Sequence, residues 1–150
     1  SVFDVNNDGY KDVLMSTLYQ YQTCHLQLLV NNKNGTFSDS TKNIPQSWGT
    51  TNTWIKWIER ADFNNDGWTD FLVSTLGGSH RLYMNKGATQ FEEASSILNI
   101  EPNIASYRVN DFDGDGLTDI AFVSFSGKLT FAKNLKPFPV QLAPGVTTSL

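Results

Sequence analysis

The sequence predicts an all-β protein made of three copies of one unit, and three observations support this prediction. A nine-residue acidic pattern, D-x-[DN]-x-D-G-x-x-D, starts at residues 4, 62 and 111. Each copy is followed by a short apolar run of the kind that forms buried strands. The starting points are 58 and 49 residues apart, which is long enough for about four strands in each unit.

Extended segments precede the second and third acidic patterns, at residues 53–61 and 104–110. Only residues 1–3 precede the first pattern, so the chain is expected to begin inside a repeat that a longer sequence or another strand completes. Further strands are expected directly after the patterns, at 13–17, 71–75 and 120–124. Their hairpin partners are expected at 26–30, 81–84 and 128–132.

An Asn-led turn follows each hairpin and precedes an aromatic residue on an expected fourth strand. These turns begin at Asn32, Asn85 and Asn134, and the aromatic residues are Phe37, Phe91 and Phe138. Segments 38–52 and 92–103 are polar and are predicted to connect the units, with a helical turn at 95–98. The proline-rich tail is expected to be a linker, or an edge strand at 139–142 with a loose end.

The predicted units are therefore residues 1–52, 53–103 and 104–138, followed by a tail at 139–150. A period of about 50 residues with four strands is typical of a β-propeller blade. Three blades would form only part of such a propeller.

Each acidic pattern places side-chain oxygens at positions 1, 3, 5 and 9, with glycine at position 6, where the chain must turn sharply. With the carbonyl of position 7, these oxygens nearly complete the shell of about six to eight ligands that Ca²⁺ prefers, whereas Mg²⁺ prefers a tighter octahedron. The candidate metal ligands are Asp4, Asn6, Asp8, Tyr10 and Asp12; Asp62, Asn64, Asp66, Trp68 and Asp70; and Asp111, Asp113, Asp115, Leu117 and Asp119.

A polar β-turn is the alternative for any single copy, but three copies that keep every acidic position favour metal binding. EF-hands are excluded because their twelfth position is a bidentate Glu, whereas Met15, Val73 and Phe122 stand there in this chain. Dockerin-type modules have two loops that lie much closer together on helices.

The charge distribution also favours metal. Ten of the fifteen acidic residues lie in the three patterns, and three Ca²⁺ ions would change the net charge from −4 to +2. Lysines and arginines form no run, so nucleic-acid binding is not expected. The single cysteine, Cys24, excludes an intramolecular disulfide, and no segment is long and apolar enough for membrane insertion.

The three patterns and the N-x-x-N-G-T-F turn resemble the FG-GAP or VCBS repeat of integrin-alpha-like β-propellers. The similarity covers about residues 1–138 and is most complete in the first repeat. The second repeat lacks the Asn-Gly pair, and the third keeps only Asn134 and Phe138. The resemblance implies a Ca²⁺ ion in each loop, and it implies further blades or associated copies that close the ring.

No catalytic signature is found, so the chain is not expected to be an enzyme. Its two histidines, His25 and His80, lie in no hydrolase or metalloprotease motif, and Cys24 and His25 would point to opposite faces of a strand. Trp54 and Trp57 are expected on opposite sides, with one packed between blades, and sugar stacking is an alternative for an exposed tryptophan. Asn34 begins a glycosylation acceptor sequence that the turn explains equally well.

The sequence therefore predicts a calcium-stabilised propeller segment of a secreted or cell-surface adhesion or recognition protein. The ions would be structural, and loops at one end would hold a protein or carbohydrate ligand. The alternative is an accessory repeat region of a secreted enzyme whose catalytic domain lies outside this chain.

Overall fold

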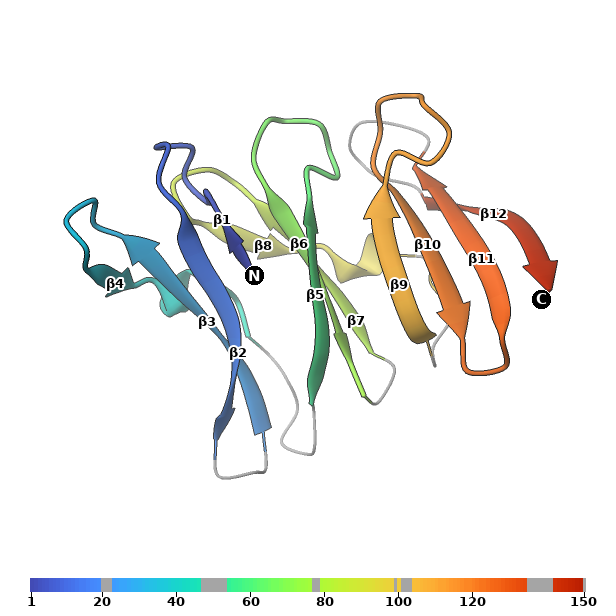
Figure 1. Ribbon diagram of the computed structural model, residues 1–150, viewed down its shortest axis with the longest axis horizontal. Coiled ribbons are helices and arrows are strands. Elements are labelled where there is room, and N and C mark those ends of the chain that lie inside the picture. The colour runs from blue at the N-terminus through green and yellow to red at the C-terminus, as the bar shows by residue number, and fades with distance from the viewer. Residues whose placement is uncertain are drawn as a thin grey trace.

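The computed structural model describes residues 1–19, 23–46, 54–76, 79–98, 100, 104–134 and 142–149. These residues form three four-stranded antiparallel sheets that lie side by side, together with two short 3-10 helices (Figure 1). The all-β prediction and the four strands of each unit are thus confirmed. Among the described residues, no helix is long and apolar enough to cross a membrane.

Each sheet is a simple up-and-down meander in which neighbours in sequence are neighbours in space. The first sheet contains β1 (Val2–Phe3), β2 (Asp12–Tyr19), β3 (Thr23–Asn31) and β4 (Phe37–Asp39). The second contains β5 (Ile55–Ala61), β6 (Asp70–Thr75), β7 (His80–Asn85) and β8 (Phe91–Glu93). The third contains β9 (Ile104–Asn110), β10 (Asp119–Ser124), β11 (Lys128–Asn134) and β12 (Leu142–Ser149).

The side chains of the second sheet alternate between two hydrophobic clusters, because successive residues of a strand point to opposite faces. Phe71 and Val73 of β6 and Tyr83 of β7 pack against the first sheet, where they meet residues such as Leu14 and Leu28. The other face of the second sheet packs against the third sheet. This cluster contains Phe63, Leu72, Leu82 and Met84 from the second sheet, and Ile104, Tyr107, Ile120, Phe122 and Ala132 from the third.

The predicted burial of the central strands on both faces is observed fully only in β6, where all six residues are buried. In β2 and β10, buried residues such as Leu14, Ile120 and Phe122 are interspersed with partly buried or exposed ones. The reason is positional, since only the second sheet has a neighbouring sheet on each side in this structure (Figure 1).

The connecting segments differ from the predictions in detail. The helical turn expected at 95–98 is present as η2 (Ser95–Ile97), and a second short 3-10 helix, η1, lies at Thr41–Asn43. The edge strand of the tail begins at Leu142, where the predicted strand ended, and pairs with β11. Pro144 lies on this edge near a shift in register, which is a position that tolerates the missing backbone N–H.

The tryptophans separate as expected, because Trp57 packs against the cluster between the second and third sheets, whereas Trp54 is exposed. Phe138 and the side chain of Cys24 lie outside the described residues, so the predictions for them stay predictions.

Candidate metal centre

The three acidic patterns form loops that connect the first two strands of each sheet, and all three lie at the same end of the molecule (Figure 1). We call them loop 1 (residues 4–12), loop 2 (62–70) and loop 3 (111–119). Each loop is closed by the same strand register, in which the residue before the pattern pairs with its last aspartate. These pairs are Phe3 with Asp12, Ala61 with Asp70 and Asn110 with Asp119.

Two positions in each loop adopt a left-handed backbone. Position 6 is the expected glycine, with φ of 87° at Gly9, 84° at Gly67 and 84° at Gly116. Position 4 was not predicted to be left-handed, yet Asn7 has φ 55° and Asn65 has φ 57°. Asparagine tolerates this conformation better than most residues. The second asparagine of the Asn-Asn-Asp-Gly order was therefore the sequence signal for a left-handed residue at position 4.

The loop backbone wraps around the side chains of positions 1, 3 and 5. In loop 2, Asp62 accepts hydrogen bonds from the backbone N–H groups of Asp66 (3.0 Å) and Gly67 (2.7 Å). Asn64 Oδ1 accepts from the N–H of Asp66 (3.2 Å), and Asp66 accepts from the N–H of Trp68 (2.9 Å). The corresponding bonds are present in loops 1 and 3, with distances from 2.7 to 3.2 Å.

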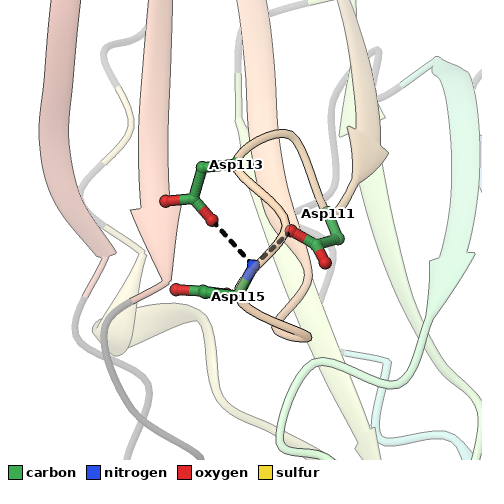
Figure 2. A group of neighbouring side chains, drawn as sticks. All are labelled: Asp111, Asp113 and Asp115. Carbon is green, nitrogen blue, oxygen red and sulfur yellow. Dashed lines mark hydrogen bonds between the residues drawn. The ribbon is translucent and has the colours of Figure 1, made fainter.

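This wrap gathers carboxylates at the exposed tip of loop 3. Single oxygens of Asp111, Asp113 and Asp115 lie within 4.8 Å of one another, and Figure 2 shows the three side chains around the backbone nitrogen of Asp115. Oxygens that bind one Ca²⁺ at about 2.3 to 2.6 Å lie up to about 5 Å apart across the ion, so this donor set fits a hard cation. In loops 1 and 2 the amides of Asn6 and Asn64 take the third position and donate to Asp8 and Asp66.

The position 9 aspartates do not lie at the loop tip with the other predicted metal ligands. Asp12, Asp70 and Asp119 are buried, and Asp119 is not gathered with the three carboxylates at the tip. Each accepts the N–H of position 2 in its own loop with one oxygen and an N–H at the end of the third strand with the other. Burial raises the pKa of Asp70 to about 7, although the N–H groups of Asn85 and Phe63 oppose this rise.

The third-strand partners are asparagines, whose place in the sequence predicts only the start of a turn. Asn85 donates its backbone N–H to Asp70 (2.7 Å), and Asn134 donates to Asp119 (2.8 Å). In the first sheet the equivalent residue is Asn31, which donates to Asp12 (2.8 Å), rather than Asn32 as the turn pattern suggested. The repeated Asn was visible in the sequence, but its contact with the loop depends on the sheet.

Lysines contact the acidic tips of two loops, which the sequence did not predict. Lys33 lies 3.3 Å from Asp8, and Lys133 contacts both Asp113 and Asp115. Hydrogen bonds with these two aspartates raise the pKa of Lys133. Backbone N–H groups hold the carboxyl pKa values of Asp8 and Asp111 below their usual range, with Tyr10 and Gly116 as the largest contributors. The carboxylates of Asp8 and Asp111 therefore stay ionised, and lysine ammonium groups lie beside the tips of loops 1 and 3.

The position 7 side chains lie outside the loop. The ring of Trp68 lies against the turn at Gly87, where an added Cβ would be 3.3 Å from the ring. Tyr10 is 46% exposed, and the Lys33 ammonium lies 5.2 Å from its ring centroid. Leu117 is half-buried.

Comparison with known proteins places this fold and these loops in a family. The sequence matches the FG-GAP-like repeat over residues 4–73 and again over residues 62–122. The chain therefore belongs to the FG-GAP-like repeat family, as its resemblance indicated.

Among curated proteins, the chain is similar to integrin alpha-3 of Cricetulus griseus, with 33% identity over 78 residues, and of Mus musculus, with 32% identity over 78 residues. Each match covers 43% of this chain and 7% of the relative. The similarity thus concerns a small part of those proteins.

Proposed function

We propose that this chain is a calcium-stabilised segment of a larger β-propeller, from a secreted or cell-surface protein of adhesion or recognition. The observation that supports this most directly is the carboxylate cluster of loop 3, which stands on a backbone wrap that the other two loops repeat. The donors are all oxygens, which suits Ca²⁺ better than softer metals.

The role proposed for calcium is structural. Asp4, Asp8 and their equivalents would hold the ion at the exposed tip, with carbonyl oxygen from position 7. The buried aspartate of position 9 would support the shell from beneath. A bound ion would offset the repulsion between crowded carboxylates and would fix the connection between the first two strands of each sheet. No histidine or cysteine is part of these loops, so the expected activity is binding rather than catalysis.

Thermal unfolding tests this proposal. Excess Ca²⁺ is expected to stabilise the chain by about 2.7 kcal/mol per site at a hundredfold excess over the dissociation constant, relative to the chelated protein. Mg²⁺ should give a smaller effect. Asp115→Ala should remove the contribution of loop 3, whereas Asp39→Ala, an exposed change outside the loops, should retain it. Equal melting temperatures in Ca²⁺, Mg²⁺ and chelator would refute the calcium proposal.

The third sheet supports the proposal that further blades complete the ring. A pocket of about 340 Å³ lies on its outer face and is lined by Ser106, Tyr107, Arg108, Phe112, Ala121, Val123, Leu129 and Phe131. Phe112 is 44% exposed, whereas Val5 and Phe63, at the same loop position, are buried beneath the following sheet. We propose that a further blade of the same class, or a second copy of the chain, covers this face.

Adhesion or recognition is supported by the similarity to integrin alpha-3 chains. In the alternative, the segment positions the catalytic domain of a secreted enzyme. Binding of a protein or glycan by the isolated segment would favour recognition, so a glycan and protein array probed with the calcium-loaded chain distinguishes the two. A segment that binds nothing on such arrays would favour the accessory role.

A further inference from the structure

The three loops are connected through the core by hydrogen bonds that involve none of the exposed carboxylates. Within each sheet, the position 9 aspartate accepts one N–H from position 2 of its own loop and one from the asparagine that ends the third strand. In the second sheet these bonds join Phe63 to Asp70 (2.9 Å) and Asn85 to Asp70 (2.7 Å). The aspartate thereby ties the loop to the third strand.

The same asparagines connect one sheet to the next. The side-chain amide of Asn85 donates to the carbonyl of Val5 in loop 1 (2.8 Å). The side-chain amide of Asn134 donates to the carbonyl of Phe63 in loop 2 (2.8 Å). Val5 and Phe63 each donate their own N–H to the position 9 aspartate, Asp12 or Asp70. A continuous path therefore runs from Asp119 in the third sheet to Asp12 in the first.

The path is buried along its length. Asn85, Asn134 and Val5 have no exposed surface, and Phe63 is 1% exposed. A buried carbonyl that loses its donor bears the cost of desolvation without compensation. Movement of one loop would therefore strain the next loop rather than be absorbed by water.

The first sheet contains an internal comparison. Asn31 occupies the equivalent position, but its side-chain amide donates to Lys11 in its own sheet (3.1 Å). Asn31 thus makes the bond to its own loop without the bond between sheets that Asn85 and Asn134 make.

We propose that Asn85 and Asn134 are positioning residues that couple the loops of adjacent blades. Loosening of loop 2 releases Asn85 from Asp70 and so withdraws the donor from Val5 in loop 1, and Asn134 connects loop 3 to loop 2 in the same way. The coupling itself does not require metal. Its consequence, that an ion in one loop strengthens binding in the neighbouring loop, rests on the calcium function proposed above.

Amide hydrogen exchange of the whole chain in chelator, measured by NMR, tests the coupling without metal. Asn85→Ala is expected to accelerate exchange of the Val5 amide about tenfold, the loss that one buried hydrogen bond predicts. Met84→Ala is the matched control, because Met84 is adjacent and equally buried but packs toward the third sheet. When exchange is normalised to the slowest-exchanging amides of each variant, which report its global stability, Met84→Ala should leave the Val5 amide within about twofold of wild type.

Two further variants test whether loop 2 depends on the asparagine of the third sheet. Asn134→Ala should accelerate the Phe63 amide, and Asn31→Ala should leave the Phe63 amide unchanged. These two variants test the coupling even if Asn85→Ala is too unstable to study. The coupling is overturned if Asn134→Ala leaves the Phe63 amide as protected as in wild type, or if Asn85→Ala and Met84→Ala accelerate the Val5 amide equally.

Calcium then tests the linkage. Asp66 contributes to the tip of loop 2 but not to the buried path, so Asp66→Ala should reduce the calcium-dependent protection of the Val5 amide at least about fivefold. In the Asn85→Ala background the same change should have no further effect. A different result is that calcium slows exchange of neither the Val5 amide nor the Phe63 amide while the variants still behave as expected in chelator. That result would refute the proposed calcium function and would leave the coupling between loops supported. If calcium protects Val5 equally in wild type and Asp66→Ala, the linkage between loops is wrong.

Discussion

At the scale of single residues, each loop contains two classes of aspartate that the shared pattern does not distinguish. Positions 1 and 5 lie half-buried or exposed at the tip, where they accept backbone N–H groups, and lysines contact the tips of loops 1 and 3. Position 9 lies in the core, where Asp70 has no exposed surface and accepts two backbone N–H groups. The tip can exchange its partners with solvent and ions, whereas the buried position maintains the fold.

The raised pKa of Asp70 predicts a pH dependence in the chelated protein. The folded pKa of about 7 exceeds the ordinary value of 3.8, so this group favours the folded state fully below pH 3.8 and loses that contribution as pH rises through 7. Between about pH 8 and 5, wild type should gain up to about 1.4 kcal/mol per pH unit relative to Asp70→Asn.

Urea unfolding of wild type and Asp70→Asn in chelator measures this difference in the free energy of unfolding. The contributions of the other carboxylates are common to both proteins and cancel. Asp39→Asn, an exposed change, serves as the control and should run parallel to wild type across the same range. A wild type that loses stability relative to Asp70→Asn as the pH falls from about 8 to 5 would contradict the assignment.

At the scale of elements, the central strand β6 organises the hydrophobic packing. Phe71 contacts the rings of Tyr83, at 4.8 Å between centroids, and Phe91, at 4.9 Å. Its neighbour Leu72 faces the opposite cluster, so the strand joins two interfaces. Among the aromatic residues expected on the fourth strands, Phe91 closes the cluster between the first and second sheets, whereas Phe37 is 45% exposed.

Truncation of Phe71 should therefore destabilise the chain strongly. Phe71→Ala is expected to cost about 3 to 5 kcal/mol, because it leaves a cavity beneath two rings. Phe125→Ala makes the same chemical change at a side chain that is 67% exposed and should cost less than about 0.5 kcal/mol. Urea unfolding in excess Ca²⁺ provides both values, and equal midpoints for the two variants would disprove the central role of β6.

At the scale of the whole molecule, the segment is open at its third sheet. The two interfaces within the chain show what a covered blade face looks like, with Val5 or Phe63 buried under the next sheet. The outer face of the third sheet has a similar apolar lining but leaves Phe112 and its pocket accessible. Exposed apolar patches of this kind mark interaction surfaces.

This face should make the isolated segment associate with itself. The mass measured by sedimentation is expected to rise above that of one chain as concentration increases, and Phe112→Ser should shift the association at least about tenfold toward higher concentration. Phe125→Ser, an exposed phenylalanine outside this pocket, is the matched control and should leave the association unchanged. A mass equal to one chain at every concentration would refute self-association through this face.

The sequence by itself determined the repeated unit, the order of its strands and the loops that separate them. These follow from local chemistry, because the acidic pattern, the glycine at position 6 and the apolar runs act over a few residues. It did not predict that Asn31 rather than Asn32 reaches the first loop, that lysines approach the tips, or that β12 begins at Leu142. The start of β12 depends on register at a sheet edge, which local sequence specifies weakly. The contacts of Asn31 and the lysines depend on how the end of each third strand lies beside the loop, which the folded sheet fixes.

Only the tertiary structure decided which polar groups lie in the core and what they join. Asp8 and Asp12 belong to one pattern, yet the first lies at the tip and the second is buried. Asn85 and Val5 are 80 residues apart and meet only because the second sheet packs on the first. A residue's partners across such an interface are fixed by the stacking of sheets, and burial then makes their hydrogen bonds obligatory.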